Sequence, residues 1–255
     1  MEGLVSGHSK EKPGYWLHTG GTGILTYIDS DEGNLGEYTE KQFNDWEDVA
    51  ELTGLPDHAF HRNVDKIVLE AASKHKDVIK LALVCPPTIY GNGRGPVSGR
   101  GRQTYELAKF ILDKQFVPII GKGKARWNNI HVADLSDVYL LLAEAAAAGK
   151  DTPGLWGGDV YYLTENGEHV WGELAALIGK RAHALGFTGA LKEDSLSKDA
   201  ALEQAGFEAV SWGWNSRGKA ERARKVVGWK PSRCSIEEEV DEILKREHDR
   251  LQSSK

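Results

Sequence analysis

Apolar residues along the chain fall into two patterns, short continuous runs and stripes that repeat every three or four positions. The clearest continuous run is DVIKLALV (77–84), which predicts a strand of a parallel sheet with both faces covered. A shorter apolar run at 14–18 predicts another strand. Between them, a helix at 61–75 is predicted from apolar positions three and four residues apart: Val64, Ile67, Val68, Ala71 and Ala72.

The same patterns continue to the end of the chain. Short strands are predicted at 116–120 and 159–163, and helices at 103–114, 134–148, 170–185, 216–227 and 235–252. Asp134 is a candidate N-cap for the second of these helices, and Gly149 is a candidate terminator. Residues 29–36 predict a loop, 43–52 predict a short helix or an extended segment, and 190–213 follow no clear pattern. This order of strands and helices is typical of an α/β fold.

The segment YWLHTGGTGIL (15–25) raises the question of a cofactor-binding loop. A dinucleotide fingerprint needs a strand, three glycines at fixed spacing and a helix that begins at once. Gly20 and Gly23 fill the first two positions of a G-x-x-G-x-x-G pattern, but the third position is Thr26. The following residues, TYIDSDEGNLGEY, carry no helical apolar stripe. The pattern therefore disfavours a pyrophosphate loop at this place.

Composition narrows the classes of function. The chain has 255 residues, of which 40% are hydrophobic, and its net charge of −6 comes from well-mixed signs. These values predict a folded globular protein without a basic surface for nucleic acid. No apolar run approaches the roughly 20 residues that a membrane helix needs, and the first residues show no targeting pattern. We therefore expect a cytoplasmic protein that does not bind membranes.

The two cysteines, Cys85 and Cys234, have no metal-ligand spacing. We expect a reduced protein with one buried and one surface thiol, and no metal site.

Four stretches carry a resemblance to a known family. They are LALVCPPTIYGNGRG (81–95), WNNIHVADLSDVYLLLAEAA (127–146), YYLTENGEHVWGELAALI (161–178) and SRGKAERARKVVGWKP (216–231). In this order, and over residues 14 to 244, the chain resembles the latter part of extended short-chain dehydrogenases/reductases of the NAD-dependent epimerase/dehydratase type. It is most similar to a fungal group of atypical NAD(P)-binding proteins.

The resemblance implies a fold and partners. It implies an α/β protein with a partial Rossmann-like parallel sheet and a smaller C-terminal α/β substrate lobe. Residues 1–95 correspond to the C-terminal half of the cofactor domain, and 96–255 to the substrate lobe and last helices, interleaved as one unit. The chain thus begins partway into the cofactor domain, without its first strands and glycine loop, and NAD(P) binding by it alone is expected to be weak. NAD or NADP is the implied cofactor, and the implied partners are a small-molecule substrate and a second copy of the chain in a homodimer.

Enzymes of this family use a Ser or Thr, a Tyr, and a Lys four residues after the Tyr. The resemblance places the Ser on Gly20, which leaves Thr22 as the candidate hydroxyl, although a turn hydroxyl bonding local backbone would look the same. The helix at 61–75, where the Tyr and Lys should lie, contains no Tyr. One register puts Asp57 and His61 in their places, and another puts Arg62 and Lys66 there.

His61 is the candidate acid or base, because imidazole titrates near neutral pH. Asp65 follows it by one helical turn, and we expect this pair to be solvated. A literal Tyr-x-x-x-Lys occurs at Tyr105 and Lys109, but it lies one strand too late, and we expect no catalytic role for it.

The resemblance also suggests positions for the ligands. Residues beside the cofactor are expected to be Thr19, Gly20, Pro86, Pro87 and Thr88, and those beside the substrate Tyr90, Arg94, Asn128, Asn129 and His131. Arg100 and Arg102 could hold an anionic substrate or lie in a solvated loop. The implied function is NAD(P)-dependent oxidoreduction or epimerisation of a small carbonyl or sugar-type substrate. The alternatives are a catalytically lapsed binding protein of the same fold and an inactive truncated product.

Overall fold

The computed structural model describes residues 2–96 and 98–253, and its central sheet is parallel. Its three strands are β1 (Gly14–Thr19), β3 (Ile79–Cys85) and β7 (Tyr161–Leu163), in the order β1-β3-β7. Gly14 pairs with Ile79 and Thr19 with Val84, so β1 and β3 end at the same edge of the sheet. The predicted strands and the α/β fold class with a Rossmann-like parallel sheet are confirmed.

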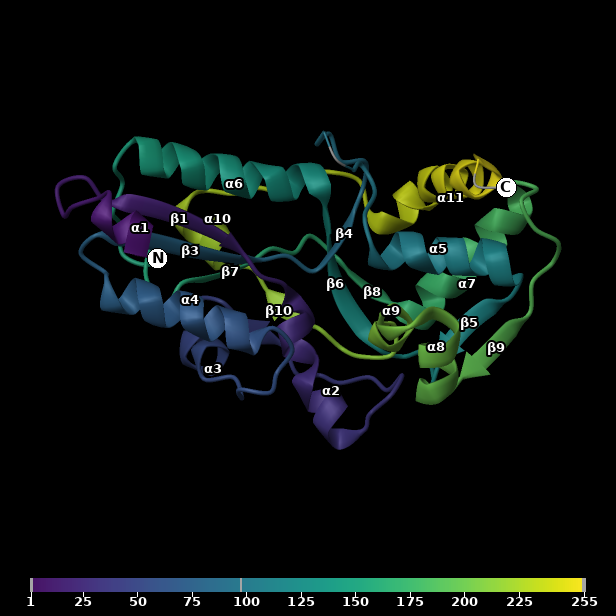
Figure 1. The fold of residues 1–255 in the computed structure, drawn as a ribbon. Coiled ribbons are helices and arrows are strands. Elements are labelled where there is room, and N and C mark those ends of the chain that lie inside the picture. The colour runs from purple at the N-terminus through teal and green to yellow at the C-terminus, as the bar shows by residue number, and fades with distance from the viewer. Residues whose placement is uncertain (1, 97, 254–255) are drawn as a thin grey trace.

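Helices cover both faces of this sheet. In Figure 1, α6 (Val132–Ala147) lies on one side of β1 and β3, and α4 (Arg62–Lys74) lies on the other. Five of the seven residues of β3 are completely buried. This double cover explains the continuous apolar run in the sequence, because neither face of the strand meets water.

The other half of the molecule holds smaller sheets and a layer of helices (Figure 1). Its sheets pair β4 (Thr88–Tyr90), β6 (Arg126–His131) and β8 (Glu168–Val170) in one group, and β5 (Val117–Ile120) with β9 (Glu193–Leu196) in another. Its long helices are α5 (Gln103–Lys114), α7 (Trp171–Ala184) and α11 (Ile236–Ser253). Each half has its own cluster of buried apolar side chains.

Short elements complete the described chain. They are α1 (Glu2–Ser6), the 3-10 helix η1 (Thr22–Thr26), α2 (Tyr27–Glu32), β2 (Phe43–Asn44), α3 (Val49–Thr53), α8 (Lys198–Ala205), α9 (Phe207–Ser211), β10 (Gly218–Lys219) and α10 (Arg222–Val226). No helix among the described residues is long and apolar enough to span a membrane.

Two sequence predictions of local structure are wrong in part. Residues 29–32, expected in a loop, belong to α2, because buried Asp29 accepts a hydrogen bond from the Asn215 side chain at 2.8 Å. The helix expected at 216–227 is reduced to α10, because Gly218 and Lys219 pair with β2 instead. Both departures come from partners far away in the sequence.

The N-cap of α6 also differs from the prediction. His131, not Asp134, caps the helix, since its Nδ1 accepts the Ala133 N–H at 3.0 Å. Asp134 is fully buried and accepts the backbone N–H groups of Ser232 and Arg233 at 3.1 and 3.0 Å. It therefore anchors the segment that leads into α11.

Candidate active site

A cavity of about 540 Å³ opens where β1 and β3 end. Gly21, Thr22 and Gly23 follow β1 and line it, and Pro86 and Pro87 line it after β3. The carboxyl edge of a parallel sheet is where α/β proteins bind ligands. The opposite wall comes from the second half of the molecule, which contributes the loop before α5 and the region of α9.

Thr22 combines a fixed backbone with a free hydroxyl. Its N–H donates to the Pro86 carbonyl at 3.1 Å, and Ser216 Oγ donates to the Thr22 carbonyl at 2.7 Å. The side chain is buried, and Thr22 Oγ1 has no hydrogen-bond partner among the described residues. Trp127, also in the cavity wall, has an unpartnered buried Nε1. Buried polar groups are normally paired, so these two suit a ligand with polar atoms.

Gly20 lies outside the cavity wall, and a side chain at this position would be tightly packed. A Cβ on Gly20 would lie 3.0 Å from Cys85 Sγ and 3.3 Å from Asp65 Oδ1, so a side chain here would point into the core. Thr19 also lies away from the cavity, with Oγ1 2.5 Å from the Tyr139 hydroxyl. Of the three expected positions after the strand, only Thr22 belongs to the cavity wall.

His61 lines the cavity immediately before α4. It adopts a left-handed backbone conformation, with φ of 67°, where few residues other than glycine are found. Neither expected Tyr-x-x-x-Lys register forms a catalytic pair here. Asp57 and Lys66 form an exposed ion pair at 2.9 Å, and buried Arg62 donates to the Leu55 carbonyl at 3.1 Å.

The expectation of a solvated His61–Asp65 pair is wrong. Asp65 is buried beneath Gly20, and its Oδ2 accepts a hydrogen bond from the Tyr161 hydroxyl at 3.1 Å. Burial raises the pKa of this carboxyl group, and the Tyr161 hydrogen bond partly offsets the effect. Helical spacing alone did not reveal that α4 turns this face towards β7.

Thr88, the last of the residues expected beside the cofactor, reaches the cavity wall only through Gln103. Thr88 is buried outside the wall, and its hydroxyl donates to Gln103 Oε1 at 2.8 Å. Gln103 does line the cavity, and its Nε2 donates to Ser211 Oγ at 3.3 Å. Thr88 therefore positions an amide in the cavity wall.

The expected substrate residues lie elsewhere. Asn128 Nδ2 donates to the Gly167 carbonyl at 3.3 Å, and Asn129 Nδ2 lies 3.1 Å from His169 Nδ1. Tyr90 donates its hydroxyl proton to the Cys234 carbonyl at 2.7 Å, and Arg94 is exposed. None of these residues lines the cavity.

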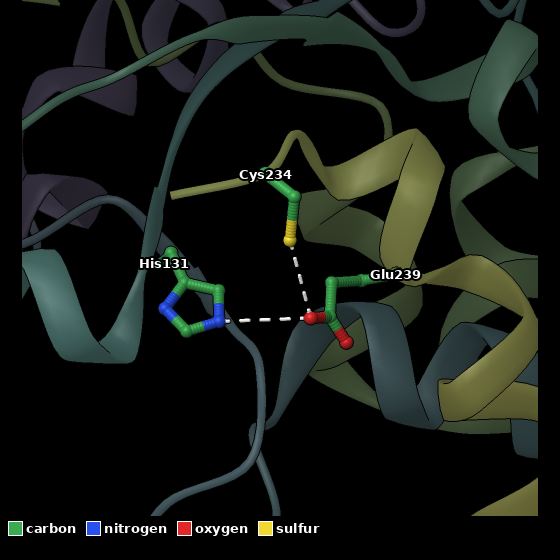
Figure 2. A group of neighbouring side chains, drawn as sticks. All are labelled: His131, Cys234 and Glu239. Carbon is green, nitrogen blue, oxygen red and sulfur yellow. Dashed lines mark hydrogen bonds and ion pairs between the residues drawn. The ribbon is translucent and has the colours of Figure 1, made fainter. Parts of the chain in front are cut away.

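His131 belongs instead to a cluster with Cys234 and Glu239 (Figure 2). Glu239 Oε1 lies 3.6 Å from His131 Nε2 and accepts a hydrogen bond from Cys234 Sγ at 3.3 Å. The three atoms resemble a set of metal ligands. However, His131 Nδ1 accepts the Ala133 N–H, so the neutral ring carries its proton on Nε2, where a metal would need a lone pair. The geometry therefore favours a hydrogen-bonded cluster.

The cysteine environments agree with expectation. Cys85 is buried, Cys234 is exposed, and both are free thiols. Tyr105 and Lys109, for which no catalytic role is expected, make structural contacts. The Tyr105 hydroxyl donates to the Gly91 carbonyl at 3.1 Å, and Lys109 lies 3.7 Å from Glu106 on the surface.

Sequence reasoning missed the aromatic part of the site. Phe60, Phe207 and Trp214 line the cavity. Phe207 begins α9 in the segment 190–213 that showed no pattern, and Trp214 directly follows that segment. The nearby arginines are already paired. Arg100 binds Glu106 and Glu247, both at 2.7 Å, and Arg102 forms an ion pair with Glu208.

Comparisons with known proteins give consistent matches. The model of the NAD dependent epimerase/dehydratase family matches residues 59–156. The chain is 34% identical over 250 residues to oxidase ucsJ from an Acremonium species, covering 95% of this chain and 72% of that protein.

Solved structures share the fold at low identity. RMD from Pseudomonas aeruginosa, complexed with NADPH, has a TM-score of 0.56 and 17% identity over 94% of this chain and 68% of that one. The dTDP-glucose 4,6-dehydratase of Streptomyces venezuelae, with NAD and TYD bound, has a TM-score of 0.59 and 13% identity over 94% and 61%. The UDP-glucose 4-epimerase of Thermotoga maritima has a TM-score of 0.55 and 15% identity over 94% and 64%.

Proposed function

This chain belongs to the NAD-dependent epimerase/dehydratase family, and from that premise we propose that it is an NAD(P)-dependent oxidoreductase acting on a small carbonyl compound or alcohol. The observation that carries the proposal is Thr22, a residue of the cavity wall whose buried hydroxyl has no partner among the described residues. The whole enzyme's activity is part of this proposal, since the chain spans 72% of its oxidase relative.

The residues at the end of β3 fit the nicotinamide end of such a cofactor. Pro86 and Pro87 form a rigid part of the wall that would border it, and the unpartnered Thr22 Oγ1 suits a carbonyl or carboxamide oxygen. When bound, a nicotinamide cofactor supplies or accepts the hydride. Thr22 would hold the reacting oxygen of the substrate by a hydrogen bond.

His61 is the proposed proton donor and acceptor. It is the one titratable side chain in the wall that is not paired in an ion pair within the described part of the chain. An imidazole exchanges protons near neutral pH, as the reduction of a carbonyl oxygen requires.

The two halves of the structure suit separate roles in binding the cofactor and the substrate. We propose that residues 1–95 form the C-terminal half of the cofactor domain and 96–255 the substrate lobe. Both buried clusters draw on residues from beyond this boundary, as in an interleaved unit: α6 and β7 pack with the first cluster.

A second candidate is a binding protein that has lost catalysis. It is favoured by the composition of α4, which contains no tyrosine. Of the residues in the expected Tyr and Lys places, Asp57 and Lys66 form an ion pair and Arg62 makes buried contacts. Among these four residues, only His61 lines the cavity. Such a protein would bind the same ligands without turning them over.

Thr22 variants test the proposal. Purified protein is assayed for oxidation of NADPH and NADH with a panel of small ketones and aldehydes. We expect Thr22→Val to lower kcat/KM about 10- to 100-fold, while Thr22→Ser, which keeps the hydroxyl, stays within about threefold of the parent. Equal activity of all three proteins would exclude a role for Thr22. Ligand binding without any oxidation of NAD(P)H would favour the non-catalytic alternative.

A further inference from the structure

Aromatic rings from both halves of the molecule meet at the cavity. Phe60 lies two residues before α4, and Phe207 is the first residue of α9; their ring centroids are 5.1 Å apart. Trp214 stands edge-on to Phe207 at 5.8 Å. Phe60 and Phe207 each remain 44% exposed, which places them at the opening. Large exposed rings that line a cavity commonly mark a binding surface for an apolar ligand.

The position of Phe60 is tied to the glycine turn after β1. A Cβ on Gly23 would lie 3.0 Å from Phe60 Cδ1, so the ring packs directly over this glycine. Gly23 and Thr22 are neighbours in the wall, and the aromatic opening therefore adjoins the proposed catalytic hydroxyl.

The charges around the cavity do not suit an anion. Two guanidinium groups, Arg100 and Arg102, belong to the wall, and both are held by carboxylates. Three carboxylates form these ion pairs: Glu106 and Glu247 with Arg100, and Glu208 with Arg102. Lys109 also lies 3.7 Å from Glu106, so the charges of this group balance and leave neither wall arginine unpaired. A diphosphate bound at this wall needs cations that are free to pair with it, and both arginines of the wall are already paired with carboxylates.

We infer that the cavity takes a neutral, largely apolar carbonyl compound with a flat ring system, held against the contacting Phe60–Phe207 pair, and that it excludes nucleotide sugars. The inference rests on the proposed function, because it assigns the substrate class of the same site. The rings bind the apolar body of the ligand, while Thr22 Oγ1 donates to its carbonyl oxygen.

Binding is measured by calorimetry, without cofactor, for two probes: 2-acetylnaphthalene, a neutral aryl ketone, and UDP-glucose. We expect the ketone to bind and UDP-glucose to show no binding or weaker binding. Phe60→Ala and Phe207→Ala should each weaken ketone binding about tenfold, because each removes one ring contact. Ile67→Ala is the matched control, since Ile67 is an exposed apolar residue of α4, outside the cavity wall, and should leave the affinity unchanged.

The inference is overturned if UDP-glucose binds as tightly as the ketone, if the ketone does not bind, or if both phenylalanine variants match the Ile67→Ala control. This readout is separate from turnover. Ketone binding with the expected variant effects, but without NAD(P)H oxidation, would support the substrate class and contradict the oxidoreductase proposal. Thr22-dependent turnover of a nucleotide sugar would do the reverse.

Discussion

Phe60 and Phe207 lie with their ring centroids 5.1 Å apart, although one precedes α4 and the other begins α9. Their contact joins the half of the molecule that carries the parallel sheet to the half that carries the smaller sheets. The cavity that both rings line therefore depends on how the two halves pack. A ligand held by both rings would stabilise that packing, because binding to the folded state alone favours it by mass action.

Releasing Arg102 should change the charge preference of the cavity. Glu208→Gln removes the carboxylate that pairs with the Arg102 guanidinium, so affinity for an anionic analogue such as 6-acetyl-2-naphthoate should rise about two- to fivefold. The gain is modest because the Arg102 side chain is 79% exposed and its interactions are screened by water. Calorimetry at low salt measures the change.

The neutral ketone provides the control for this variant, since its affinity should not respond to Glu208→Gln. An unchanged affinity for the anion, or an equal gain for both ligands, would contradict the role assigned to the Arg102–Glu208 pair.

Gly20 should resist substitution. Gly20→Ala places a Cβ 3.0 Å from Cys85 Sγ, and we expect the free energy of unfolding to fall by about 1–3 kcal/mol. Urea denaturation measures this cost. In a Cys85→Ala background the sulfur is gone and the cost should be smaller. An equal cost in both backgrounds would show that Cys85 does not set the requirement for glycine.

His169 should make stability depend on pH. Burial lowers the pKa of His169 from 6.5 to about 3, so below pH 6.5 the unfolded chain binds a proton that the folded chain does not. Stability is therefore full above pH 6.5 and falls as the pH drops towards 3. Between pH 7.5 and 5.0 this group alone should account for about 2 kcal/mol of lost stability, measured by urea denaturation.

His169→Gln removes that component, whatever its effect on stability at pH 7.5. His183→Gln, at an exposed site, serves as the control and should keep the parent's pH dependence. If His169→Gln loses as much stability as the parent between the two pH values, the buried neutral imidazole is not its source.

The two thiols should react very differently. Burial raises the pKa of the Cys85 thiol far above its ordinary value. Cys234 is an exposed residue, and partial desolvation of its thiol together with the neighbouring Glu239 carboxylate raises its pKa. Ellman's reagent should modify one thiol in the folded protein and two in denaturant. Glu239→Gln should speed the first reaction, because a thiolate forms more readily away from a carboxylate. Tight Zn²⁺ binding that Glu239→Gln abolishes would contradict the proton assignment on His131.

The sequence pattern correctly predicted the elements that depend on local apolar periodicity. The strands β1 and β3 and the helix α4 follow from apolar periodicity, because each buries a continuous or striped surface against one layer. The short helix α2 and the cap of α6 did not follow from it. Asp29 is fixed by Asn215, and Asp134 is bonded to Ser232, and neither contact leaves a local trace in the sequence.

The same distinction applies to the residues of the candidate site. The positions after β1 and β3 could be located from the sequence because strand ends are locally encoded, and the structure puts Thr22, Pro86 and Pro87 in the cavity wall. Asn129 and His131 belong to another motif of the family resemblance (127–146), yet their side chains contact His169 and Glu239 in the fold. The aromatic opening could not be foreseen, because it forms only where distant segments pack together.

The most direct test of the central claim is a crystal structure of the protein with 2-acetylnaphthalene. The account predicts that the ketone lies against the Phe60–Phe207 pair, with its oxygen about 3 Å from Thr22 Oγ1. A ketone bound outside this cavity, or one whose oxygen lies away from Thr22, would contradict it.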